Sequence, residues 1–226
     1  MGKYENRKRR TVSSRTFIML LALCAVLLVA ATVMGTMAYL TSQDEVVNTF
    51  TAGKVAIKLD ETKVDQNGTA VTPAERVKAN TYKLVPGHTY TKDPTVTLLK
   101  GSETSYIKMT VTFSKAKELD AIFAPTGAEL TDIFNGYNKD VWLYKGDTKN
   151  ETDNTRTYEF WYSATVNTDN GVDVELLSLF ESITVPGSIT NEQLKTIEGM
   201  TITVNAYAIQ FDGFTTPEAA WAAFNG

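Results

Sequence analysis

The stretch Tyr106-Ile107-Lys108-Met109-Thr110-Val111-Thr112-Phe113 decides the fold. From Ile107 to Phe113, apolar side chains occupy every second position, and a lysine and two threonines stand between them. Successive side chains of an extended chain point to opposite faces, so this alternation predicts a strand with one buried face and one polar face. Threonine and valine also favour strands. We therefore expect a half-buried β-strand here.

The same alternation recurs in four further runs along the chain. They are Val55 to Leu59, Val96 to Leu98, Tyr158 to Val166 and Thr201 to Phe211. In the last run the apolar phase shifts near Ala206, which indicates either a β-bulge or a strand buried on both faces. Turn signals such as Asn67-Gly68 and Asp212-Gly213 separate the runs.

Short helical stretches interrupt the strands. We expect helices at Lys115 to Phe123, Glu129 to Phe134 and Asn191 to Ile197, and a last one that opens at Thr215-Thr216-Pro217-Glu218. In the last helix, Thr215 is the expected cap and Glu218 its capping-box partner. The order of elements predicts one all-β domain, a two-sheet sandwich with short helical insertions and a short C-terminal helix.

The first 38 residues have the pattern of a secretory signal peptide. Six basic residues precede an uncharged run from Thr16 to Gln43, and Phe17 to Met34 is almost wholly apolar. The small residues Thr36 and Ala38 fit a cleavage site, so we expect an N-terminal signal helix that is cut between Ala38 and Tyr39. The alternative is an uncleaved anchor, because about 18 to 20 apolar residues can cross a bilayer. In either case the rest of the chain is expected outside the cytoplasm.

Without residues 1–38 the protein is acidic and has no cysteine. This segment holds six of the 22 Lys and Arg residues and one of the 26 Asp and Glu residues, which leaves 16 basic and 25 acidic side chains and a net charge near −9. Such a charge disfavours a nucleic-acid partner, which needs a basic face. The only cysteine, Cys24, lies in the apolar segment, where Leu23 before it does not fit a lipoprotein signal. Residues 39–226 can form no disulfide and must rely on a hydrophobic core.

The sequence offers little catalytic chemistry. His88, the only histidine, is expected to be an exposed turn residue, and a His-Glu-x-x-His zinc site would need two histidines. The run Asp169-Asn170-Gly171-Val172-Asp173 lacks the ligand spacing of a calcium loop and is expected to be a solvated turn. A carboxylate pair for glycoside hydrolysis could come from any two strands, but nothing favours one. Trp142, Trp161 and Trp221 are expected in the core. We predict no catalytic, metal-binding or cofactor-binding residue.

The junction after the apolar segment resembles the start of a known family. It reads Gly35-Thr36-Met37-Ala38-Tyr39-Leu40-Thr41-Ser42, followed by Asp44-Glu45-Val46-Val47-Asn48-Thr49-Phe50-Thr51-Ala52-Gly53-Lys54-Val55-Ala56-Ile57-Lys58-Leu59. This looks like the TasA/camelysin (CalY) group of Firmicutes proteins, which are cut by the dedicated signal peptidase SipW. Five further segments are most similar to the clostridial BsaA-like branch of that group. They are Val85-Pro86-Gly87, Lys92 to Val96, Gly101 to Ile107, Ala206 to Phe214 and Ala219-Ala220-Trp221.

The resemblance implies a secreted fibre subunit of the biofilm matrix, located in the extracellular matrix or at the cell surface of a Gram-positive bacterium. It implies a jelly-roll-like domain over residues 53–226 and an extended arm at residues 39–52. In the family, an N-terminal segment of one subunit can complete a sheet of the next. Such a head-to-tail contact does not close and yields filaments, since an open sheet edge accepts an extended segment.

The arm at residues 39–52 is the candidate donor strand. We expect Val46, Val47 and Phe50 to be buried in the neighbouring subunit. The alternative is that residues 46–59 form only the first strand of the subunit's own sheet.

Two other functions stay open at this stage. The camelysin name implies a metallopeptidase, although the chain has one histidine and no recognisable zinc motif. A surface adhesin or matrix-binding module would instead bind a polysaccharide or a host protein as a monomer. The expected partners are the chain itself as a head-to-tail homopolymer, SipW during export, and other matrix proteins or polysaccharide. No nucleic acid and no cofactor are expected.

Overall fold

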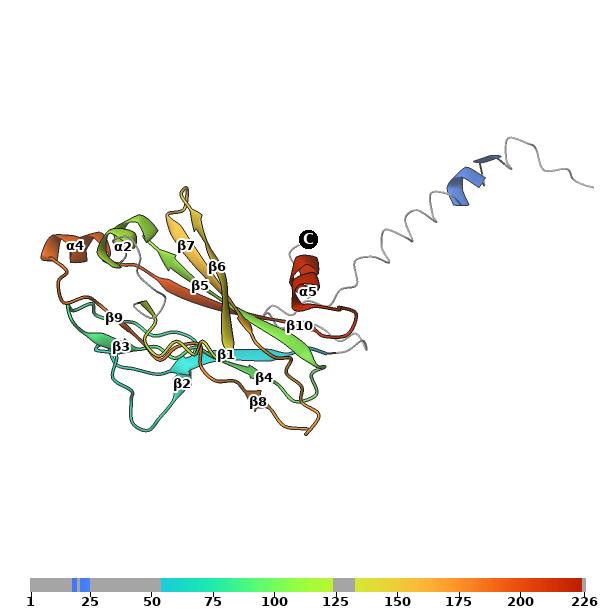
Figure 1. The fold of residues 1–226 in the computed structure, drawn as a ribbon, viewed down its shortest axis with the longest axis horizontal. Helices are drawn as coiled ribbons and strands as arrows, with labels where there is room; N and C mark the ends of the chain where they lie inside the picture. The colour runs from blue at the N-terminus through green and yellow to red at the C-terminus, as the bar shows by residue number, and fades with distance from the viewer. Residues whose placement is uncertain (1–17, 20, 25–53, 124–132, 225–226) are drawn as a thin grey trace, which may run out of the picture. The chain divides into compact units, whose positions relative to one another are not determined.

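The computed structural model describes residues 18–19, 21–24, 54–123 and 133–224 (Figure 1). The chain divides into two compact units, Met1–Leu40 and Thr41–Gly226. In the first unit, the described residues are helical. Within the described ranges, no helix is long and apolar enough to cross a membrane. The predicted cleavage site at Ala38 and Tyr39 lies outside these ranges.

The described part of the second unit consists mostly of β-strands, in two four-stranded sheets and one two-stranded sheet. The first four-stranded sheet has the order β2-β1-β4-β8, with antiparallel neighbours. Its strands are β1 (Ile57–Thr62), β2 (Arg76–Val77), β4 (Thr95–Leu98) and β8 (Val174–Glu175). The two-stranded sheet pairs β3 (Thr89–Thr91) with β9 (Ser182–Thr184).

The second four-stranded sheet has the order β10-β5-β7-β6. Its strands are β5 (Ser105–Ser114), β6 (Trp142–Asn150), β7 (Thr155–Tyr162) and β10 (Ile202–Gln210). β10 pairs with β5 along its whole length without a shift in register. β6 pairs with β7, with a bulge between Tyr144 and Gly146. Among the described residues, strands β10 and β6 are thus the two edges of this sheet.

The two large sheets share one hydrophobic core. Val96 and Leu98 from β4 pack in it with Met109 and Val111 from β5, and all four side chains are fully buried. The ring of Phe134 lies among other aromatic rings, those of Phe113, Tyr158, Phe160 and Phe180. The alternation in the sequence therefore places apolar faces from both sheets in the same layer, as in a sandwich. The prediction of a mostly β fold with a few short helices is confirmed.

The structure of strand β10 explains the shift in apolar phase that the sequence shows near Ala206. Its register with β5 is unbroken, so the bulge alternative is wrong. Burial on both faces explains the shift instead. Ala208 belongs to the main core, whereas Ile209 lies in a second, smaller cluster with Tyr106 and Trp221. Trp221 comes from helix α5 (Pro217–Phe224), which packs on β10.

The other short helices are α2 (Ala116–Phe123) and α4 (Asn191–Thr196), as expected. At α4, the Thr190 hydroxyl accepts a hydrogen bond from the Gln193 backbone and the Gln193 side chain returns one, which makes a capping box. The predicted cap of α5 is wrong by one residue. The hydroxyl of Thr216, not Thr215, accepts the backbone N–H of Ala219 at 3.2 Å. Most of the predicted helix at 129–134 lies outside the described residues.

Two turn predictions have different outcomes. His88 is half-buried rather than exposed, because its ring packs against Tyr90 with 4.7 Å between the ring centroids. The run 169–173 is a turn, as expected, and the Asp173 carboxylate accepts the backbone N–H of Lys100 at 2.8 Å. Trp142 and Trp221 are buried as predicted, whereas Trp161 is only half-buried.

Candidate functional site: a groove beside an open sheet edge

Strand β10 has an open edge over the described part of the chain. There its backbone pairs with β5 alone. At the two ends of the pair, Ser114 N–H donates to the Thr201 carbonyl at 3.0 Å and Phe211 N–H donates to the Thr104 carbonyl at 2.7 Å. Hydrogen-bonded pairs alternate along an antiparallel ladder, so the odd-numbered residues of β10 bond to β5. The backbone groups of Ile202, Val204 and Ala206 therefore point away from β5.

The sequence of this edge has none of the features that usually prevent strand pairing. From Met200 to Phe211 there is no charged residue and no proline, and the strand has no bulge. Lysines, prolines and bulges are the common protections of an edge strand in natural proteins. The edge of β10 is therefore chemically able to pair with a further strand.

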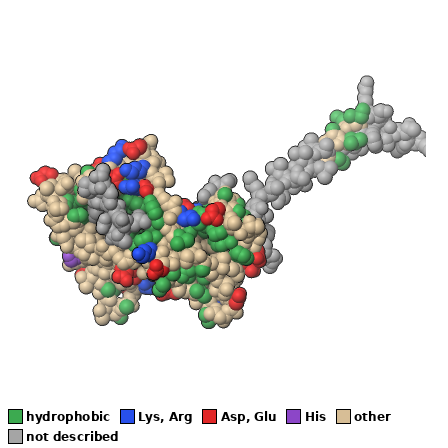
Figure 2. Space-filling view, in the orientation of Figure 1, with side chains coloured by type: hydrophobic (Ala, Val, Ile, Leu, Met, Phe, Trp, Pro, Cys, Tyr) green, Lys and Arg blue, Asp and Glu red, His purple; other side chains and the backbone are tan. Residues whose placement is uncertain are grey.

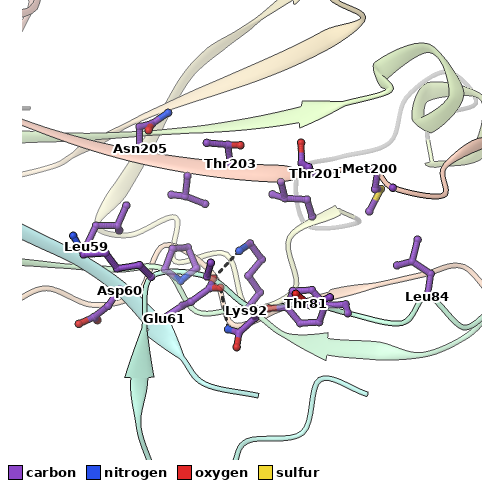
Figure 3. Close-up of a pocket in the computed structure, with 18 of the residues that line it drawn as sticks. Leu59, Asp60, Glu61, Thr81, Leu84, Lys92, Met200, Thr201, Thr203 and Asn205 are labelled. Atoms are coloured by element: carbon purple, nitrogen blue, oxygen red, sulfur yellow. Dashed lines mark hydrogen bonds and ion pairs between the residues drawn. The ribbon is translucent and has the colours of Figure 1, made fainter. Parts of the chain in front are cut away.

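A groove of about 1330 Å³ runs beside this edge, between the two large sheets (Figure 3). The wall opposite β10 consists of β1 and the segment 78–84, and the end of α4 closes one side. Figure 3 shows Leu59 and Asn205 toward one end of the groove and Leu84 and Met200 toward the other. The apolar side chains that line it are Ile57, Leu59, Ala79, Tyr82, Leu84, Pro94, Leu194, Met200, Ile202, Val204, Ala206 and Tyr207.

The floor of the groove contains a buried ion pair. Lys92 Nζ lies 2.6 Å from Glu61 Oε2, and the two side chains are only 8% and 7% exposed. The other carboxylate oxygen, Oε1, accepts the Asn80 amide at 2.9 Å. Burial, and secondarily the charge of Glu61, raise the pKa of the nearby Tyr82 hydroxyl, which donates to the Thr91 carbonyl. Tyr82 is therefore a neutral hydrogen-bond donor throughout the physiological range.

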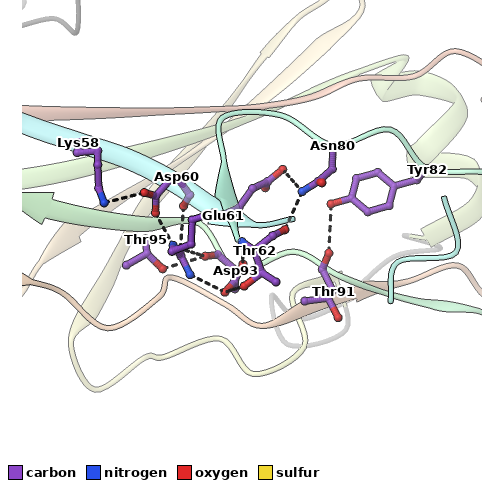
Figure 4. Close-up of polar contacts among 10 residues, drawn as sticks. Lys58, Asp60, Glu61, Thr62, Asn80, Tyr82, Thr91, Asp93 and Thr95 are labelled. Atoms are coloured by element: carbon purple, nitrogen blue, oxygen red, sulfur yellow. Dashed lines mark hydrogen bonds and ion pairs between the residues drawn. The ribbon is translucent and has the colours of Figure 1, made fainter. Parts of the chain in front are cut away.

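A second charged cluster centres on Asp60, one of the residues that line the groove (Figure 4). Arg76 Nε lies 2.5 Å from Asp60 Oδ1, and its Nη1 lies 3.2 Å from Asp93 Oδ2. Burial alone would raise the pKa of Asp60, but hydrogen bonds from Arg76 and Lys58 lower it below its ordinary value. Asp93 also accepts the backbone N–H of Thr62 at 2.6 Å. The cluster therefore fixes the end of β1 against β2 and the start of β4.

The rim of the groove is mainly basic. Its four exposed charged residues are Lys78, Lys83, Lys195 and Glu198. The deeper charges, Asp60, Glu61 and Lys92, are held in the ion pairs described above. Figure 2 shows that hydrophobic side chains also reach the surface on one face of the molecule, in patches between charged groups.

The opposite edge of the same sheet, β6, is protected. Its bulge places Lys145 between Tyr144 and Gly146, and Gly146 has a φ of +122°, a conformation that favours glycine. Lys149 pairs with Asp120 at 2.5 Å, and Arg156 Nε pairs with Asp147 Oδ2 at 2.8 Å. Charges and a bulge thus stand where β10 has neither.

The predicted donor residues Val46, Val47 and Phe50 lie outside the described residues. The structure instead identifies a groove from segments far apart in the sequence, which sequence reasoning did not single out. One signal was present, the uncharged run from 200 to 211. Among the described residues, no group of three or more His, Cys, Asp and Glu side chains is arranged to hold a metal ion.

Comparison of the chain with protein-family models, with curated proteins and with solved structures found no match.

Proposed function

We propose that this protein is a secreted structural subunit that polymerises into extracellular fibres by strand addition. In this proposal the groove beside β10 receives residues 39–52 of another copy. The observation that carries it is the edge of β10, which is uncharged, free of bulges and set over an apolar groove. An added strand would satisfy the outward backbone groups of Ile202, Val204 and Ala206 and cover the apolar lining.

The sequence of the arm suits such a groove. In an extended strand, side chains two apart share a face, so Val46 and Phe50 would point into the groove together. Val47 would point to the opposite face, so we expect it to contribute less than the other two. Asp44 and Glu45 are the only charged residues of the arm, and their charge is opposite to that of Lys83 and Lys195 on the rim.

Export and cleavage complete the proposal. The resemblance to the TasA/camelysin group supports a jelly-roll-like domain and cleavage by SipW after Ala38, in the matrix or at the surface of a Gram-positive cell. Cleavage would free the arm at Tyr39, whereas an uncleaved chain would keep it attached to the apolar segment. Because the acceptor groove and the donor arm are different surfaces, the contact is heterologous and gives open filaments.

Deletion of residues 39–50 tests this function. We expect the wild-type protein, once processed, to form filaments visible by electron microscopy, and the truncated protein to remain monomeric. A matched control is Thr49→Ser, which leaves Val46 and Phe50 in place and should form normal filaments.

A synthetic peptide of residues 39–52 identifies the occupant of the groove. It should bind the truncated monomer and protect β10 amides from hydrogen exchange. Normal filaments from the truncated protein would refute the proposal. A wild-type protein that stays monomeric and binds a polysaccharide would support the adhesin alternative instead.

A further inference from the structure

The groove floor contains three side chains in an arrangement that can do chemistry. Glu61 lies between Lys92 and Asn80, with one carboxylate oxygen facing each (Figures 3 and 4). Oε2 is 2.6 Å from the lysine Nζ, and Oε1 is 2.9 Å from the asparagine Nδ2. The amine and the carboxylate are almost entirely buried. A primary amine, a carboxamide and an acid–base group are thus held together with little access to water.

The carboxamide of Asn80 is also held and polarised by the backbone. Its Oδ1 accepts the N–H of Val64 at 3.0 Å, and its Nδ2 donates to the Thr62 carbonyl at 2.9 Å. The Val64 N–H thus occupies the place of an oxyanion donor, because it already binds the oxygen that would gain negative charge during attack at Cγ. Because Glu61 contacts both the lysine amine and the asparagine amide, it holds the two side chains near each other, and such positioning lowers the barrier of a reaction.

We propose that Lys92 and Asn80 form an intramolecular isopeptide bond, with Glu61 as the acid–base catalyst. The Nζ proton moves to Glu61 Oε2, and the neutral amine attacks Cγ of Asn80. Glu61 then protonates the departing Nδ2, and the C–N bond to Nδ2 breaks. The second proton of Nζ passes to the released ammonia, which leaves a neutral amide bond between Nζ and Cγ. Overall, one lysine ammonium and one carboxamide become one secondary amide and one ammonium ion. The reaction needs no oxidant, reductant or metal.

The bond would occupy a structurally useful position. Lys92 directly follows β3, and Asn80 belongs to the segment 78–84 that forms one wall of the groove. A covalent link would hold that wall to the start of β4 in a part of the chain that contains no cysteine. This inference does not depend on polymerisation, since the three residues belong to one subunit.

Intact-protein mass spectrometry of the purified full chain tests the bond. We expect the wild-type mass to lie about 17 Da below the mass of its sequence, the mass of one ammonia. Digestion should release a single branched peptide that contains both Lys92 and Asn80, identified by tandem mass spectrometry. A wild-type protein of full mass would overturn the proposal, whatever the behaviour of any variant.

Three variants test which residues the loss of ammonia depends on. Glu61→Gln keeps the shape of the catalyst but removes its acid–base function, and should show the full mass. Asn67→Ala excludes a cyclic imide at Asn67-Gly68, which also releases ammonia, and should keep the loss. Lys83→Arg changes an exposed lysine of the segment 78–84, and this variant should also show the mass loss. A mass loss that disappears in Asn67→Ala would overturn the proposal.

Discussion

The two edges of the sheet β10-β5-β7-β6 differ in the features that prevent pairing with a further strand. β6 carries a bulge, a glycine at positive φ and the charged residues Lys145, Asp147 and Lys149. β10 has the same length and the same kind of neighbour, but it is regular and uncharged. The two edges also differ in burial, because β6 is mostly exposed whereas β10 is half-buried between α5 and the groove. The comparison indicates that one edge is kept from pairing and the other is left able to pair.

The largest effect should come from blocking the open edge. In Val204→Pro the proline removes an N–H that points away from β5, so the β10–β5 ladder keeps its hydrogen bonds. We expect the concentration needed for filament assembly to rise at least about tenfold, equivalent to 1.4 kcal/mol or more of lost contact energy. Sedimentation across a series of protein concentrations measures this assembly threshold.

Lys149→Pro is the matched control for Val204→Pro. By the same alternation from the β7 register, Lys149 faces outward on β6, so the substitution also spares the ladder. Its filaments should form at the wild-type concentration. If both proline variants assemble equally well, the assignment of the acceptor edge is wrong.

Removing the protection of β6 should give a smaller, opposite effect. Deletion of Lys145 combined with Lys149→Val removes the bulge and two charges. In a chain that also lacks residues 39–50, we expect this regular edge to cause side-by-side association, detectable by light scattering. Lys145→Ala, which keeps the extra residue, should stay monomeric. A deletion variant that also stays monomeric would show that the bulge has no protective role.

The smallest effect concerns the pH dependence of the protected edge. Burial alone would raise the pKa of Asp147, but hydrogen bonds from Arg156 and Tyr144 lower it below its ordinary value. The stabilisation is therefore complete above about pH 5 and is lost as the pH falls through the lowered pKa, below about pH 4. Because the pair is partly exposed to solvent, we expect it to contribute at most about 1 kcal/mol.

Urea unfolding at pH 7 and pH 3 measures this contribution. The free energy of unfolding of Asp147→Asn should fall less on acidification than that of the wild type. Asp140→Asn, at an exposed acid just before β6, should keep the wild-type pH response. If the free energy of unfolding of Asp147→Asn and of the wild type responds equally to acidification, the ion pair of Asp147 with Arg156 does not stabilise this edge.

The strands were predictable because their pattern is local. The alternation in Tyr106 to Phe113 becomes the central strand β5, and the shift near Ala206 marks the place where β10 becomes buried beneath α5. Cap positions were less accurate, because Thr215 and Thr216 offer the same hydroxyl and only the backbone selects between them. The burial of His88 was missed because it depends on Tyr90, whose ring is positioned by β3.

The candidate site was not predictable in the same way. The groove forms between β1 (Ile57–Thr62) and β10 (Ile202–Gln210), which lie far apart in the sequence. The contact of Glu61 with both Lys92 and Asn80 likewise depends on how three separate segments pack. A local pattern can show that a strand is uncharged, but only the sheet order shows that it is an edge.

The packing of α5 on β10 gives the protein its own fluorescence reporter. Lys108 Nζ lies 4.7 Å from the centre of the Trp221 ring, and Tyr207 of β10 is part of the same aromatic group. Trp142 is instead fully buried at the start of β6, where its indole N–H donates to the Leu177 carbonyl. Indole emission depends on nearby charge and polarity, so an event at β10 would change the light from Trp221 and from Trp161, whose ring centroid lies 6.2 Å from that of Trp221, while Trp142 provides an internal reference. Strand capture could thus be followed in solution without any attached dye.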